Sequence, residues 1–151
     1  MHDNFGKDPA MFECSGWNPY ATPDMARETV AEFIASYTNP RTYSWAIEHA
    51  GRLIGTIGAY DHDADRNAIE VGMSIEKASW RKGFATEALS VVLHYLAEEE
   101  EIAAITAWCA SGNIGSRRAM EKAGMMRVNI EKDVLTIGDA AFDRLWYKYP
   151  G

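Results

Sequence analysis

The turn Arg81-Lys82-Gly83 stands directly before a helical pattern and is the stretch of the chain best suited to bind an anion. An apolar, strand-like run over 69–75 precedes it, and helical spacing of apolar residues begins at Phe84. The first turn of a helix has backbone N–H groups without intrahelical partners, and the helix dipole favours negative charge there. Glycine lets the backbone approach an anion closely. Residues 81–86 therefore predict a pyrophosphate site, with an ordinary solvated turn as the alternative.

The elements that must position this turn follow from apolar periodicity and turn residues. Thr22 as N-cap and Pro23 at the first position predict a helix that Asn39-Pro40 ends. The remaining elements are predicted over these ranges: strands Thr42–Glu48, Leu53–Tyr60 and Ala68–Ile75, a helix over 84–97, a strand Ala103–Cys109, a helix from about Ile114 to Ala123, and strands of about Met126–Leu135 and Ala140–Tyr149. Gly124 is suited to end the second long helix.

This order predicts an α+β, or mixed α/β, domain in which helices cover a mostly antiparallel sheet. The first three strands form an antiparallel meander, because their turns are short. The unit from strand 69–75 through helix 84–97 to strand 103–109 predicts a parallel crossover, and open sheets bind ligands beyond the carboxyl ends of such strands. Nothing marks a linker or a repeat, so residues 1–151 are interpreted as a single domain.

Composition narrows the class of partner. A net charge of −7 argues against binding a nucleic-acid backbone, which requires a dominant basic surface. Two cysteines and the lack of an apolar leader favour a reduced, cytoplasmic location, and no apolar run is long enough to span a membrane. The four histidines are scattered, so no metal site is expected.

Two motifs carry a resemblance to a known family. Residues Trp80–Ala88 resemble Trp-Gly-Lys-Gly-Tyr-Ala-Thr-Glu-Ala, the acetyl-CoA loop of RimJ/RimL-like ribosomal-protein N-terminal acetyltransferases within the GNAT superfamily. Arg81 stands where that pattern has glycine, and Phe84 where it has tyrosine. Residues Asn113–Met125 resemble a second pattern of the same branch, Asn-x-x-Ser followed by Glu-Lys-x-Gly. The resemblance covers roughly residues 8–149 and identifies the chain as an N-acetyltransferase.

The resemblance implies a GNAT-like sheet in which a parallel strand pair splays apart, with acetyl-CoA as co-substrate and no metal. Gly72 suits a bulge or kink that opens the sheet, or is a plain strand glycine. The family's usual N-terminal strand and helix have no counterpart in the matched region. The resemblance implies that acetyl-CoA contacts Met73, Ser74, Ile75, Arg81, Lys82, Gly83, Phe84, Ala85, Thr86 and Asn113. Asn113 can also be a helix N-cap, and the N–H of Met73 is the implied donor to the thioester oxygen.

Acetyl transfer needs a neutral amine, whereas most amines are protonated at neutral pH. Glu70 is the preferred general base because it lies on the splayed strand. Alternatively, Glu70 is a solvated strand glutamate without a catalytic role. Glu13 and Asp61 are the other candidate bases. Many GNAT enzymes have a tyrosine that donates to the leaving thiolate, but Met120 occupies that position here. Ser116 is therefore the candidate donor. Alternatively, its hydroxyl bonds the backbone at the start of the helix.

The acceptor is predicted to be a primary amine, either a protein N-terminus or a small amine, attacked directly in a ternary complex. Trp17 and Tyr60 are candidates for lining its groove. No motif places Cys14 as a nucleophile, so a covalent intermediate is not favoured. The alternatives are an acyl-CoA-binding module with weak catalysis and a protein-binding regulator on the same fold. A homodimer is compatible with the sequence.

Overall fold

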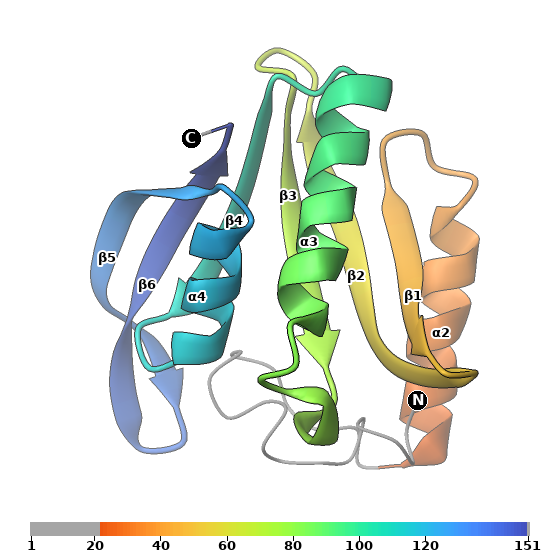
Figure 1. Cartoon of the computed structure of the whole chain (residues 1–151), viewed down its shortest axis with the longest axis horizontal. Helices are drawn as coiled ribbons and strands as arrows, with labels where there is room; N and C mark the ends of the chain where they lie inside the picture. The colour runs from red at the N-terminus through yellow and green to blue at the C-terminus, as the bar shows by residue number, and fades with distance from the viewer. Residues whose placement is uncertain (1–21, 151) are drawn as a thin grey trace.

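A computed structural model of the protein describes residues 22–150, which form a six-stranded sheet with helices on both faces (Figure 1). The elements are α2 (Pro23–Ser36), β1 (Tyr43–His49), β2 (Arg52–Asp63), β3 (Ala68–Ile75), the 3-10 turn η2 (Lys77–Ser79), α3 (Phe84–His94), the π-helical turn η3 (Tyr95–Glu99), β4 (Ala104–Ala110), α4 (Ile114–Lys122), β5 (Met126–Ile137) and β6 (Ala140–Tyr149). The strand order is β1-β2-β3-β4-β6-β5. Only the pair β3–β4 is parallel in this sheet, so the predicted fold class is confirmed.

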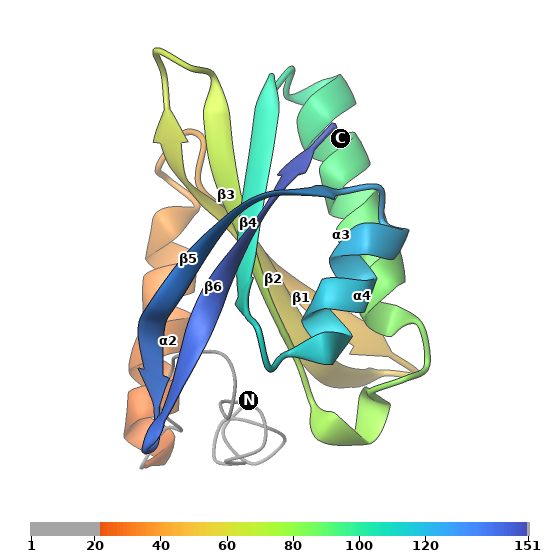
Figure 2. The same cartoon turned by 90° about the vertical axis from the view of Figure 1, so that its left-hand side faces the viewer.

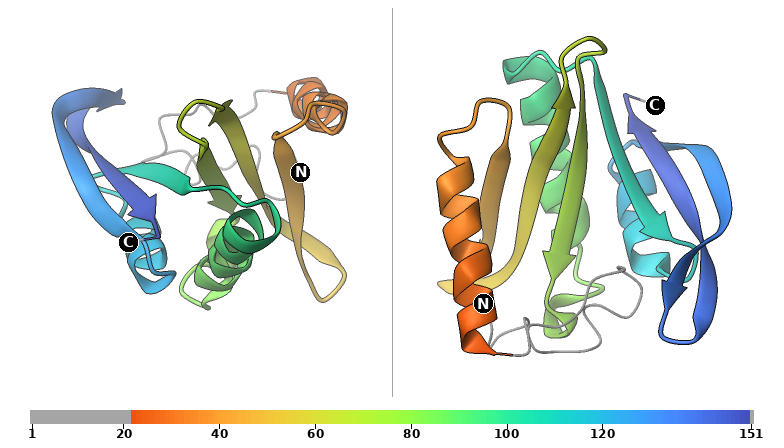
Figure 3. Two further views of the ribbon diagram at one scale, coloured as in Figure 1. Left: turned by 90° about the horizontal axis from the view of Figure 1, so that it is seen from above. Right: turned by 180° about the vertical axis from the view of Figure 1, so that it is seen from behind.

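The helices divide between the two faces of the sheet. Helices α3 and α4 lie side by side on one face, and α2 lies on the other face beside β1 (Figures 2 and 3). Helix α2 begins where the sequence predicts, because the Thr22 hydroxyl accepts a hydrogen bond from the Met25 N–H at 3.3 Å. No helix among residues 22–150 combines the length and apolar character that a membrane crossing needs.

The hydrophobic core lies between the sheet and helices α3 and α4. Alternate residues of the central strands face it, as the period of two in a strand requires. Helix α3 contributes the residues that recur at helical spacing on its inner side. The core residues below 3% exposure are Ala59, Ile69, Leu89, Leu93, Leu96, Ile105 and Tyr147. This layer fixes the face to which each β3 and β4 side chain points.

The long helix predicted over 84–97 ends differently from the sequence prediction. The α-helix stops at His94, and a wider turn follows over Tyr95–Glu99. The wider turn brings the Glu100 carboxylate to the hydroxyls of Tyr95 and Tyr43, which donate to it at 2.6 and 2.7 Å. The apolar pattern runs through both parts of the helix, so periodicity alone did not mark the change.

Candidate active site at the fork between β3 and β4

The parallel pair β3–β4 forms a fork. Their register contains only Ala68–Ala104, Ile69–Ile105 and Glu70–Thr106, after which β4 continues alone beside β6. The two strands part toward their carboxyl ends, and the N-termini of α3 and α4 lie at that same end (Figure 1). Main-chain groups of β3 and the ends of two helix dipoles therefore face one opening.

The main chain of β3 is oriented for pairing within this fork. Glu76 N–H donates to Ile54 on β2 at 2.8 Å, and antiparallel ladders alternate in direction from residue to residue. Glu70, Gly72, Ser74 and Glu76 therefore direct their main-chain groups to β2, whereas Val71, Met73 and Ile75 direct theirs into the fork. The register with β2 runs regularly through Gly72, so of the two alternatives at this position the plain strand glycine holds and no bulge is present.

Trp80 fixes the end of β3. Its indole Nε1 donates to the Ile75 carbonyl oxygen at 2.7 Å. Glu76, only 3% exposed, accepts two hydrogen bonds from Arg52, each 2.7 Å long, and one from the Ser79 hydroxyl at 2.8 Å. A bidentate arginine–carboxylate pair is a rigid contact. The segment that leads into the basic turn is therefore anchored on both sides.

The basic turn has the backbone that the sequence predicts for an anion site. Gly83 is the N-cap of α3 with φ +86°, and a Cβ placed on it would meet no atom within 4 Å. The main chain is thus exposed at the helix N-terminus, where unpaired N–H groups and the dipole favour an anion. Arg81 and Lys82 carry exposed side chains on the same turn.

Arg81 adopts φ +61°, a left-handed conformation that residues other than glycine, asparagine and aspartate rarely take. This conformation explains the glycine in the family pattern at that position. The departure noted in the sequence therefore introduces local strain as well as a positive charge.

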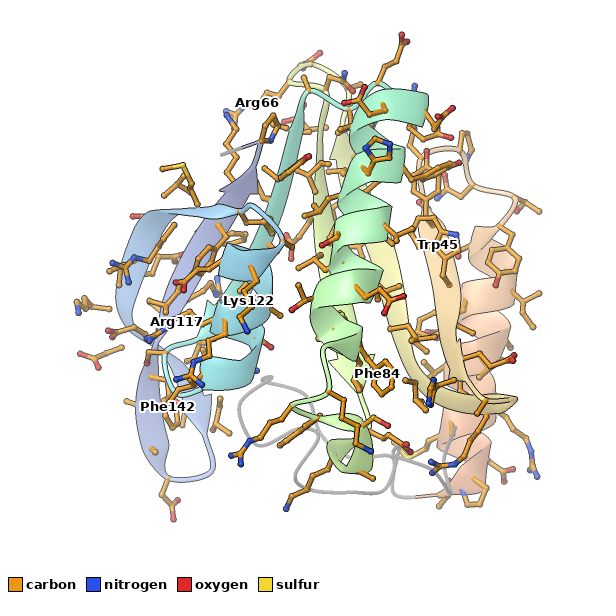
Figure 4. All side chains as sticks on the ribbon, in the orientation of Figure 1. Trp45, Arg66, Phe84, Arg117, Lys122 and Phe142 are labelled. Carbon is orange, nitrogen blue, oxygen red and sulfur yellow. The ribbon has the colours of Figure 1, made fainter. Side chains whose placement is uncertain are left out.

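The first turn of α4 carries the second motif. Asn113 Oδ1 accepts a hydrogen bond from the Ser116 N–H at 3.1 Å, which makes Asn113 the N-cap and leaves its amide nitrogen as a donor. Ser116 is half-buried, one turn into the helix. Met120 is 4% exposed and packs in the core. Figure 4 shows Phe84 at the start of α3 and the basic Arg117 and Lys122 on α4.

On the face opposite α3 and α4, a carboxylate lies at the base of the fork. Glu70 Oε1 accepts a hydrogen bond from Trp108 Nε1 at 3.0 Å and a longer one from the Tyr60 hydroxyl at 3.4 Å. Burial raises the pKa of Glu70 above its ordinary value, and the negative charge of Asp61 acts in the same direction. The two hydrogen bonds and the Arg144 guanidinium oppose this shift in the pKa. A raised carboxyl pKa suits a group that accepts a proton near neutral pH.

The structure brings most of the predicted residues to the fork, on its two sides. The main chain of Met73 and Ile75, the turn 81–86, Asn113 and Ser116 belong to the end shared by the helix N-termini. Glu70 and Tyr60 lie on the opposite face, with Tyr60 paired to Glu70 in the β2–β3 register. Trp17, Glu13 and Cys14 lie outside the described residues. Within residues 22–150, no group of three or more His, Cys, Asp or Glu side chains is arranged to hold a metal ion.

Trp108 and Arg144 are the site residues that the sequence did not reveal. Trp108 belongs to neither sequence motif, yet its indole N–H donates a hydrogen bond to Glu70. The Arg144 guanidinium carbon lies 4.8 Å from the Trp108 ring centroid. The alternation Thr106-x-Trp108 indicates that these two residues share one face of β4. The contact between Trp108 and Glu70 depends on the order of the strands in the sheet, which this alternation does not predict.

Comparison with known proteins identifies the family. A family model described as "Acetyltransferase (GNAT) domain" matches residues 1–126. The uncharacterized N-acetyltransferase YoaA of Bacillus subtilis is 28% identical over 122 residues, 80% of this chain and 69% of YoaA. The chain spans between 44% and 69% of the length of the curated relatives that it matches.

Solved structures share the fold at low sequence identity. The structure of RimL, a ribosomal L7/L12 alpha-N-protein acetyltransferase in complex with coenzyme A, has a TM-score of 0.87 and 15% identity, covering 97% of this chain and 84% of that one. Spermidine N-acetyltransferase from Vibrio cholerae, in complex with CoA and spermine, has a TM-score of 0.82 and 16% identity, covering 97% and 85%.

Proposed function

The chain belongs to the acetyltransferase (GNAT) domain family, and from this premise we propose that it is an N-acetyltransferase that uses acetyl-CoA to acetylate a primary amine. The RimJ/RimL-like branch is the proposed subgroup, because both sequence motifs of that branch are present and the RimL structure matches over 97% of the chain. The acceptor is either a protein N-terminus or a small amine. RimL and the Vibrio cholerae enzyme represent these two substrate classes.

The residues on the helix side of the fork fit acetyl-CoA. We assign its pyrophosphate to the main-chain N–H groups of 81–86, where Gly83 leaves open space above the helix N-terminus. The pantetheine arm is assigned to the main chain of residues 73–75, since the polar groups of Met73 and the N–H of Ile75 point into the fork. The Ile75 carbonyl already accepts a hydrogen bond from Trp80. The amide nitrogen of Asn113 supplies a further donor.

The proposed reaction is direct transfer. The neutral amine attacks the thioester carbonyl carbon, a C–N bond forms, the C–S bond breaks, and CoA leaves as its thiolate. The proton that the amine loses passes to the Glu70 carboxylate, directly or through a water. Met73 N–H is assigned to the thioester oxygen as negative charge develops on it. Ser116 is assigned as hydrogen-bond donor to the departing sulfur.

One observation carries this proposal: Glu70 is the last β3 residue paired with β4, so a candidate base lies where the two strands begin to separate. The N-termini of α3 and α4 lie at the end of the fork where the strands are furthest apart. Met120 favours a second candidate, a CoA-binding module with weak catalysis, because a buried methionine cannot donate the proton that a tyrosine would.

Thiol release from acetyl-CoA with a panel of amines separates the two candidates. We expect turnover with at least one α-amine or polyamine, and a loss of kcat of about 10²-fold or more in Glu70→Gln with unchanged CoA affinity. Micromolar CoA binding without turnover on any amine would instead support the binding module. Wild-type turnover in Glu70→Gln would exclude Glu70 as the base.

A further inference from the structure

Trp108 links the two strands across the fork. It lies on β4 two residues beyond Thr106, the last residue of that strand whose backbone pairs with β3. Its indole N–H nevertheless reaches Glu70 Oε1 at 3.0 Å. This hydrogen bond therefore joins β3 and β4 on the face opposite α3 and α4, at the point where the main chains have separated.

Trp108 is itself held in place by side chains of β6 and β5. The Arg144 guanidinium lies over its ring at 4.8 Å and is 5.8 Å from the Trp146 ring, and the two indole centroids are 6.5 Å apart. Glu131 on β5 accepts a hydrogen bond from Trp146 Nε1 and lies 3.8 Å from an Arg144 nitrogen. Stacking of a guanidinium on indoles restricts both partners. The indole that donates to Glu70 is thus held by two neighbouring side chains, Arg144 and Trp146, and Glu131 contacts both of these.

This geometry distinguishes the two oxygens of the Glu70 carboxylate. Within residues 22–150, the hydrogen bonds that this carboxylate accepts from Trp108 and Tyr60 both end on Oε1. A carboxylate accepts at both oxygens, so Oε2 is the oxygen left for an incoming amine. A base works only when it is held within hydrogen-bond reach of the proton that it removes.

We propose that Trp108 is a positioning residue for acetyl transfer: its indole N–H holds Oε1 of Glu70 across the fork and directs Oε2 toward the acceptor amine. This inference rests on the proposed function, in which Glu70 is the general base. Trp108 acts through Glu70 and is not assigned a contact with the acetyl group.

The charged and titratable groups that face Glu70 are Tyr60 and Asp61 from β2 and Arg144 from β6. Loss of the indole donor removes one of the influences that lower the pKa of Glu70, so that pKa must rise. A hydrogen bond to a charged group corresponds to a shift of about one pH unit. The protonated, inactive form of Glu70 then persists to higher pH.

Trp108→Phe tests the proposal, because it keeps an aromatic ring but removes the donor. We expect the acid limb of the kcat–pH profile, measured with one amine for all variants, to move up by about one pH unit. Trp45→Phe is the matched control: it makes the same substitution on β1, where the ring packs against Tyr43 and Tyr95 rather than near Glu70, so the limb should stay at its wild-type pH. An unmoved limb in folded Trp108→Phe, or equal shifts in both variants, would overturn the proposal.

A second readout does not depend on activity or on a folded Trp108 variant. In the wild-type protein, the indole N–H proton signal of Trp108 in NMR spectra should titrate with the Glu70 carboxyl carbon, and the titration should vanish in Glu70→Gln. Separate titrations of the two groups would contradict the proposal. If instead Glu70→Gln is fully active while the two signals titrate together, the contact exists but the assigned base is wrong.

Discussion

The hydroxyl of Tyr60 occupies the space that a side chain at Gly72 would need. A Cβ built on Gly72 would lie 2.6 Å from the Tyr60 hydroxyl oxygen and 3.3 Å from the nearest ring carbon. Gly72 therefore leaves room for the Tyr60 ring and hydroxyl beside β3, where the hydroxyl reaches Glu70, its partner in the β2–β3 register. The role of this glycine is to admit a neighbouring ring, because the strand pairing through it is regular.

Gly72→Ala is expected to displace the Tyr60 ring and separate its hydroxyl from Glu70. The overpacked methyl group should lower the free energy of unfolding by about 1–3 kcal/mol and reduce kcat, while CoA affinity is kept. Thermal melts and thiol release measure the two effects. In a Tyr60→Phe background the hydroxyl oxygen, the atom closest to the new methyl group, is gone, so Gly72→Ala should lower the free energy of unfolding by less. Equal losses in both backgrounds would show that the Tyr60 hydroxyl is not the reason that glycine is needed at position 72.

Arg81→Gly is expected to stabilise the protein, because φ +61° costs an arginine energy that glycine does not lose. A gain of about 1 kcal/mol corresponds to a Tm about 3 °C higher in a domain of this size. Lys82→Gly removes the same charge from a residue without positive φ and should lower the Tm. If both variants shift the Tm alike, charge rather than backbone strain is the cause. CoA affinity measured on the same pair shows what each cation contributes.

Glu70→Gln is expected to raise stability at neutral pH while it removes activity. The pKa of Glu70 is raised in the folded state, so its ionised form opposes folding above that pKa. Below the unfolded pKa of about 4.3, the carboxyl is protonated in both states and this cost is absent. The Tm difference between the variant and wild type should therefore be positive at pH 7 and close to zero near pH 4. A difference independent of pH would show that the charge of Glu70 is not responsible.

The sequence predicts those strands, helix caps and turns of this site that depend on residues close together in the chain. The bounds of β3, Ala68–Ile75, match the predicted strand, and the N-cap roles of Thr22 and Asn113 follow from side chains that bond a nearby N–H. The glycine turn before α3 is likewise local, since Gly83 both ends the loop and caps the helix. Each side-chain cap depends on residues three positions apart, and the strand is marked by its own eight consecutive residues.

The interactions around Glu70 could not be predicted in the same way. Trp108 reaches Glu70 from a strand 38 residues away, and Arg144 stacks on Trp108 because β6 lies between β4 and β5. The strand order and the end of the β3–β4 pairing are tertiary features that alternation of apolar residues leaves open. The reason for Gly72 is also non-local, since it depends on a tyrosine of the neighbouring strand.

The central claim is that the main chain of 81–86 binds the pyrophosphate of CoA, and calorimetric titration of CoA into Gly83→Glu tests it most directly. The new carboxylate would stand in the open space over the helix N-terminus, so affinity should fall at least about tenfold, or 1.4 kcal/mol. Gly138→Glu is the matched control, since Gly138 also has positive φ and open space but lies in the β5–β6 hairpin. We predict micromolar CoA binding in wild type and Gly138→Glu and strongly weakened binding in Gly83→Glu; equal affinities in all three proteins would contradict the account.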